Sequence, residues 1–192
     1  GMRVQEIPGT ARMLQSQAQE RFTMTSSRRI FLSGLPCAAT LFMGLAKGAN
    51  ATDNNDLEEL IEKAIQADGS LELPKGDFIA SGIPINRGLT ITGLGDQTRL
   101  ISPDGQPIFT ITTTESVTLR GLSFSGSALA QGEALVTAAR SPGLLIDMCR
   151  FSDSPAGGLH LEGCGGAVTG CHFSRIATTA LFARDSTGLD IS

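Results

Sequence analysis

Four polar residues in the second half of the sequence have side chains suited to acid–base chemistry. They are Asp147, Arg150, Asp153 and His172. An imidazole changes charge near neutral pH, so His172 is the candidate acid or base, and the carboxylates and the guanidinium would orient a substrate beside it. One interpretation is therefore a polar groove in which these four side chains converge as a catalytic site.

A structural interpretation of the same residues is the alternative. The repeat described below places four pairs opposite each other: Arg120 with Asp147, Asp153 with Arg175, Glu162 with Arg184, and Arg150 with His172. Three of these pairs join opposite charges, and cross-strand pairs of that kind stabilise a sheet by about 0.2 to 1 kcal/mol each. Paired charges on a solvated face are the commoner case, and both interpretations stay open at this point.

The aromatic residues offer little for sugar recognition. The chain has no Trp or Tyr, and its repeated phenylalanines are expected to point inward. We therefore expect no strong stacking of sugar rings on the surface. His160 should face outward as a lone surface histidine without a fixed partner.

No metal or cofactor motif is recognisable. The acids Asp104, Asp153 and Asp185 have the chemistry to bind calcium, but EF-hand spacing and Gly-rich calcium repeats are both absent. There is also no CxxC pair or His/Cys cluster of the kind that binds zinc. We expect no cofactor and no metal.

Charge is divided unevenly along the chain. Residues 1–51 hold six Lys/Arg and two Asp/Glu, a net charge of +4, which leaves nine against seventeen, or −8, for the rest and −4 in total. An acidic body repels phosphate backbones, and no basic cluster is interleaved with aromatic residues. Nucleic acid is therefore not expected as a partner.

Three of the four cysteines lie in the acidic part of the chain, namely Cys149, Cys164 and Cys171, while Cys37 precedes it. Three thiols cannot all pair with one another, and their irregular spacing is not that of a disulfide framework. We expect buried thiols, with a disulfide between Cys149 and Cys171 as the alternative.

An internal repeat gives the strongest indication of fold. Three segments align on a Phe-Ser pair: Arg120–Gly126, Asp147–Asp153 and Thr169–Arg175. Their phenylalanines, Phe124, Phe151 and Phe173, are separated by 27 and 22 residues, so one unit is about 22 residues with an insertion in one turn. Periods of this size are typical of solenoids.

The repeat predicts an all-β, right-handed parallel β-helix of about five coils, the last incomplete. The segments between the Phe-Ser pairs also repeat, so each coil has at least two short strands. Equivalent residues of successive coils lie about 4.8 Å apart, and the three phenylalanines should form an internal file. Ser125, Ser152 and Ser174 should form a hydroxyl ladder at a corner. A leucine-rich repeat is less suitable because its asparagine signature is missing.

Residues 52–70 predict an amphipathic helix that covers the first coil. Asp56 is the expected N-cap, with Glu59 three residues later and Gly69 as the stop. The β-helix then occupies residues 71–192, where Leu189–Ile191 begins another copy of the repeat. Solenoid ends need covering, so we expect the natural protein to continue, or a partner or second copy to cover this coil by self-association.

Residues 1–51 have the layout of a secretory signal peptide. A basic segment precedes an apolar run that reaches Ala46, and small residues at Ala49 and Ala51 form an A-x-A cleavage site. Arg28, Arg29, Phe31 and Leu32 resemble the twin-arginine export motif, although Ser33 stands where that motif usually has lysine. The resemblance implies a bacterial protein that the twin-arginine machinery exports, in folded form, to the periplasm or the medium.

Two further segments, Leu71–Phe78 and Leu89–Leu100, resemble the opening of pectate-lyase-superfamily (pectin-lyase-like) β-helix proteins. With the leader, residues 27–192 resemble a family of twin-arginine-translocated repeat proteins. The resemblance implies binding or processing of envelope or extracellular polysaccharide, by a lyase, hydrolase or epimerase if the protein is an enzyme. A non-catalytic scaffold for structural or protein interactions is the alternative, because this fold hosts many functions.

Overall fold

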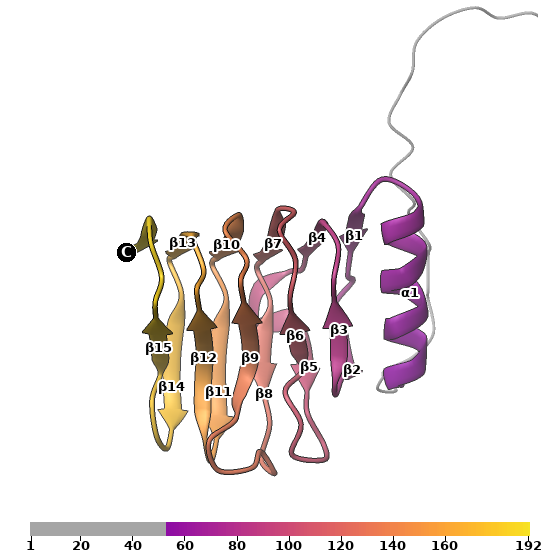
Figure 1. The fold of residues 1–192 in the computed structure, drawn as a ribbon. Helices are drawn as coiled ribbons and strands as arrows, with labels where there is room; N and C mark the ends of the chain where they lie inside the picture. Colours follow the sequence, from indigo (N-terminus) through magenta and orange to yellow (C-terminus); the bar gives the residue numbers. More distant parts are fainter. Residues whose placement is uncertain (1–52) are drawn as a thin grey trace, which may run out of the picture. The chain divides into compact units, whose positions relative to one another are not determined.

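The computed structural model describes residues 53–192, which form a parallel β-solenoid of about five coils preceded by one helix. Figure 1 shows the coils stacked side by side, with the helix against the first coil. The predicted export residues Arg28, Arg29, Phe31 and Leu32, and the predicted cleavage residues Ala49 and Ala51, lie outside the described residues and stay predictions.

Three parallel sheets run along the stack; five coils each contribute one strand to each sheet, and β16 adds a sixth strand to the first sheet. Sheet 1 contains β1 (Ser70–Glu72), β4 (Leu89–Thr92), β7 (Val117–Arg120), β10 (Leu144–Asp147), β13 (Gly166–Thr169) and β16 (Leu189–Ile191). Sheet 2 contains β2 (Gly76–Ile79), β5 (Thr98–Ile101), β8 (Ser123–Ser125), β11 (Arg150–Ser154) and β14 (His172–Ile176). Sheet 3 contains β3 (Ile83–Ile85), β6 (Phe109–Ile111), β9 (Ala134–Ala139), β12 (Gly157–Glu162) and β15 (Leu181–Arg184).

The strands alternate inward and outward, as the sequence predicts. In β7, Val117 and Leu119 are fully buried while Thr118 is half-buried and Arg120 is exposed. Leu144 and Ile146 of β10 repeat this pattern one coil later. Apolar residues therefore fill the interior of every coil, and polar residues line its outer faces.

The pairing register confirms the predicted repeat. Phe124 pairs with Phe151, and Phe151 with Phe173, in successive strands of sheet 2. Their rings stack at centroid distances of 5.0 and 4.9 Å, and Phe109 meets Phe124 edge-on at 5.9 Å. Ser125, Ser152 and Ser174 share a register position beside this file, as predicted, but they lie within the strands of sheet 2 rather than at a corner.

Corners between sheets use left-handed backbone conformations at equivalent positions. Between sheets 1 and 2, Gly121, Met148 and Gly170 occupy the same corner in three successive coils, with φ of 59°, 51° and 58°. Glycine adopts this conformation without steric cost, whereas methionine does not. Met148 is therefore the strained member of an otherwise glycine corner.

The helix α1 (Asn54–Gln66) begins earlier than the sequence predicted, and the expected N-cap was wrong. Asp53 holds the N-cap position without a side-chain hydrogen bond, and Asp56 lies in the first turn, where its charge still suits the positive end of the helix. The apolar face buries Leu57, Ile61 and Ala64 against the first coil, where α1 contacts β1 and β2. A short 3-10 helix, η1 (Gly95–Gln97), precedes β5. Within residues 53–192, no helix has the length and apolarity needed to cross a membrane.

Candidate functional site

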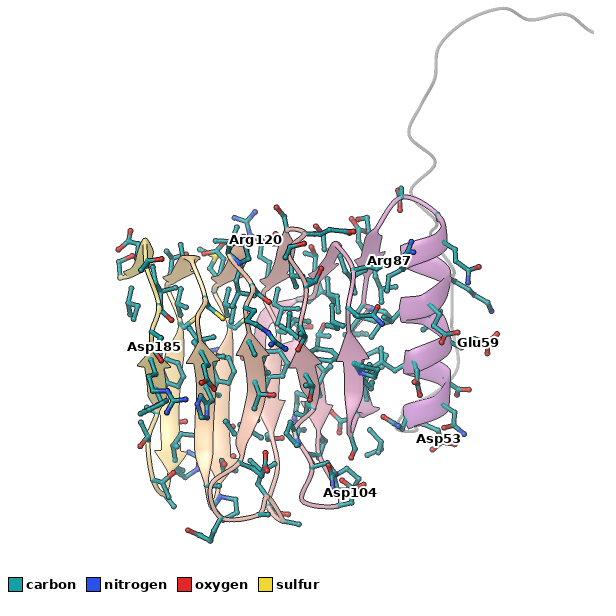
Figure 2. The ribbon with its side chains drawn as sticks, in the orientation of Figure 1. Asp53, Glu59, Arg87, Asp104, Arg120 and Asp185 are labelled. Atoms are coloured by element: carbon teal, nitrogen blue, oxygen red, sulfur yellow. The ribbon has the colours of Figure 1, made fainter. Side chains whose placement is uncertain are left out.

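Asp147, the first of the predicted catalytic residues, lies at the end of β10 and is held by two neighbouring coils. The Nε atom of Arg120 is 2.9 Å from its Oδ2, and the hydroxyl of Thr169 donates to its Oδ1 at 2.8 Å. Figure 2 labels Arg120 on the outer surface of the stack. Both carboxylate oxygens of Asp147 are thus engaged in contacts between coils.

Asp153 lies in β11 and forms a two-pronged ion pair with Arg175 of the next coil. Arg175 donates from Nε to Oδ1 at 2.5 Å and from Nη2 to Oδ2 at 2.8 Å. The hydrogen bond from Arg175 lowers the pKa of Asp153 to about 2. This carboxylate is therefore kept ionised rather than poised to exchange a proton near neutral pH.

Arg150 and His172 are the two predicted catalytic residues that the structure places next to each other. They occupy paired positions on the outer face of sheet 2, and both are exposed. Ser123 occupies the same position one coil before Arg150. In the part of the chain that the structure describes, neither Arg150 nor His172 forms an ion pair.

Three predicted pairs of opposite charge are all present: Arg120 with Asp147, Asp153 with Arg175, and Glu162 with Arg184. The repeat register alone is sufficient to find them, because equivalent residues of successive coils are neighbours. The fourth predicted pair, Arg150 and His172, is also adjacent. The two predicted aspartates are thus bound to arginines of neighbouring coils, while Arg150 and His172 remain available on sheet 2.

A shallow hollow of about 190 Å³ lies elsewhere, on sheet 3, and none of the four predicted residues lines it. Its lining combines small or apolar residues with a carboxylate, an imidazole and two hydroxyls: Gly132, Glu133, Ala134, Gly157, Leu159, His160, Thr178, Thr179 and Phe182. Such a mixed surface suits a small polar ligand that also presents an apolar face.

An exposed aromatic pair forms one side of this hollow. Phe182 of β15 pairs in register with His160 of β12, and their rings meet edge-on with centroids 4.7 Å apart. Phe182 is 42% exposed. The prediction that the repeated phenylalanines Phe124, Phe151 and Phe173 point inward is confirmed, and Phe182 lies outside that set. The alternation of Leu181, Phe182 and Ala183 would have placed Phe182 on the outside.

The acidic residues do not gather into a metal-binding cluster. Among residues 53–192, no group of three or more His, Cys, Asp or Glu side chains has the arrangement needed to hold an ion. Every buried side-chain nitrogen or oxygen in this range also has a hydrogen-bond partner.

Comparison with known proteins gives no family for this chain. No protein-family model matches it, and no curated protein matches it. The assignment of fold rests on the strand pairing described above.

Proposed function

We propose that this is an exported β-solenoid protein that binds polysaccharide of the cell envelope or the extracellular medium, with a sugar ring bound at the hollow on sheet 3. The observation that supports it best is the exposed ring of Phe182 beside His160. An aromatic face packs against the apolar face of a sugar, and the surrounding hydroxyl, imidazole and carboxylate groups can bond to its hydroxyls. Export to the periplasm or medium by the twin-arginine machinery belongs to the same proposal.

Processing of the polysaccharide, rather than binding alone, would require an acid or base near the sugar. His160 and Glu133 are the titratable groups that line the hollow, and His172 with Arg150 forms the other accessible set. A lyase, hydrolase or epimerase of this fold would place converging, unpaired polar groups in a cleft. Catalysis would be supported if the protein releases product from a bound glycan. Loss of that release in His160→Ala would assign catalysis to the hollow, and loss in His172→Ala would assign it to His172 and Arg150.

A non-catalytic scaffold is the second candidate, and the charge pairs favour it. Asp147, Asp153 and Glu162 each bond to an arginine across coils. Charges satisfied in this way strengthen the stack and leave few groups free for chemistry. A flat binding response to every glycan tested would favour this candidate.

The test is binding of the full chain to a broad panel of neutral and acidic glycans, measured with and without calcium. Phe182→Ala should weaken binding about tenfold, because one aromatic contact is worth about 1 kcal/mol or more beyond its buried area. Leu94→Ala is the matched control, since Leu94 is also an exposed apolar residue, at 57%, and lies outside the hollow. Equal affinities for the two variants would contradict the proposed site.

A further inference from the structure

Two thiols lie one coil apart at the corner between sheets 1 and 2. The residues before and after them pair in register, Asp147 with Thr169 and Arg150 with His172. Cys149 and Cys171 are thus at equivalent positions, and the amide of His172 donates to the carbonyl of Cys149 at 2.9 Å. Cys149 is fully buried, Cys171 is half-buried, and both are free thiols.

The spacing of neighbouring strands allows a bond between these sulfurs. Adjacent parallel strands lie about 4.8 Å apart, and disulfides join residues whose Cα atoms are about 4.4 to 6.8 Å apart. The two side chains also point the same way: Cys149 bonds to the carbonyl of Asp147, and Cys171 to that of Thr169, which are equivalent contacts. A second pair of contacts is also equivalent, because Cys149 bonds to the carbonyl of Leu119 and Cys171 to that of Ile146.

The two cysteines differ in acidity and exposure. The neighbouring Cys149 thiol lowers the pKa of Cys171, whereas the neighbouring Cys171 thiol, followed by burial, raises the pKa of Cys149. The thiolate is the nucleophile in thiol–disulfide exchange. Cys171 is also the more accessible of the two, so it is the one that meets an oxidant first.

We propose that Cys149 and Cys171 are a redox-active pair that closes into a disulfide between consecutive coils when the folded protein meets a disulfide oxidant. The Cys171 thiolate attacks one sulfur of the oxidant and releases the other as a thiol, which leaves a mixed disulfide on Cys171. Cys149 loses its proton and attacks the Cys171 sulfur, which releases the second oxidant sulfur as a thiol. Two protein thiols are oxidised and one oxidant disulfide is reduced to two thiols.

Cys164 provides a control within the same fold. It is buried at the corner after β12, and its equivalents in the preceding and following coils are Ser141 and Ser186. It therefore has the burial of Cys149 without a cysteine in register. If the register of the coils decides which thiols pair, oxidation should leave Cys164 as a free thiol.

The experiment uses the full chain carrying Cys37→Ser, treated with oxidised glutathione in its folded state. Trypsin then separates residues 141–150, which contain Cys149, from residues 151–175, which contain Cys164 and Cys171. The proposal predicts that these two peptides are linked, that the link survives an added Cys164→Ser change, and that Cys171→Ser abolishes it. Circular dichroism serves as the control that each variant is folded.

A second readout needs only the variant with Cys37→Ser and Cys164→Ser, whose remaining cysteines are Cys149 and Cys171. Both thiols should disappear together on oxidation, and the oxidised chain should melt about 5 °C or more above the reduced chain, because the crosslink restricts the unfolded state. The proposal is overturned if both thiols persist in this variant or if each instead retains glutathione. It is also overturned if Cys149 links to Cys164 in the peptide experiment on the Cys37→Ser chain.

Discussion

At the scale of single residues, position within the repeat decides what a side chain does. Phe151 and Phe182 are the same residue type, yet Phe151 is fully buried in the internal file and Phe182 is 42% exposed. The difference follows from strand alternation, since the two residues occupy inward and outward positions of their strands. Composition therefore does not predict the accessible ring, whereas register does.

The Asp153–Arg175 pair gives a residue-scale prediction about pH. Arg175 holds the pKa of Asp153 at about 2, below the value of about 3.9 for an unperturbed aspartate. Replacing Arg175 by Ala should return the pKa of Asp153 toward that ordinary value, as measured by carboxyl NMR during an acid titration. Arg184→Ala, which breaks the separate pair with Glu162, should leave Asp153 unchanged.

The sign of the linked stability effect follows from the same shift. Because folding lowers this pKa, the ionised pair stabilises the folded protein above about pH 4, and that contribution is lost as the pH falls toward 2. The Arg175→Ala variant should therefore lose less stability over this interval than the parent. An Asp153 pKa that stays near 2 in that variant would show that Arg175 is not the cause.

The sequence predicts the cross-coil charge pairs because they depend only on register. It does not predict every polar contact that the register creates. The bond of Asp147 to Arg120 was predicted, but its second bond, from Thr169 at the paired position of the next coil in the same sheet, was not. The hollow beside His160 was missed because Glu133 and Thr178 reach it from loops outside the repeat pattern.

At the scale of elements, the corner shared by Gly121, Met148 and Gly170 gives a prediction about backbone strain. A non-glycine residue in the left-handed conformation destabilises the folded state by about 1 to 2 kcal/mol. Glycine avoids this strain, but its greater freedom in the unfolded chain offsets part of the gain. Met148 has φ of 51° and is 62% exposed, so it has little packing to lose. Met148→Gly should raise the free energy of unfolding by about 0.5 to 1 kcal/mol, as measured by urea denaturation.

The opposite change at the same corner provides the control. A Cβ atom added at Gly121 would lie 2.8 Å from the carbonyl oxygen of Gly93, whereas at Gly170 the nearest atom is a side-chain carbon of Met148 at 3.6 Å. Gly121→Ala should therefore destabilise the protein more than Gly170→Ala does. If Met148→Gly is less stable than its parent, the left-handed backbone of Met148 does not strain the folded protein, and the prediction is contradicted.

The helix shows how far local patterns define an element. Its apolar face was predictable because Leu57, Ile61 and Ala64 recur at helical spacing. Its first residue was not, because Asp53 and Asp56 are both acceptable caps by residue type. The sequence indicated at least two strands per coil, and the structure has three; strands as short as Ile83–Ile85 contain too few residues for the sequence to fix the number.

At the scale of the whole molecule, the two ends of the stack differ. The first coil is covered by α1, which buries Leu57 and Ile61 against it. In the last described coil, β14, β15 and β16 each pair with a strand on one side only. The inward residues of this coil, Phe173, Leu181 and Leu189, are half-buried, whereas their equivalents in earlier coils are enclosed. Unpaired backbone and apolar surface therefore lie together at this end.

Self-association through this coil is the prediction that follows, because edge strands with apolar neighbours pair with other chains unless a charge blocks them. Ile191 lies in β16 and is 54% exposed. The full chain should form dimers or larger species with rising concentration, as measured by light scattering, and Ile191→Lys should shift the population toward monomer. Leu94→Lys adds the same charge at a residue of similar exposure, 57%, away from this coil, and should leave association unchanged. A monomer at every concentration, or equal effects of the two lysines, would mean that this edge is not the contact.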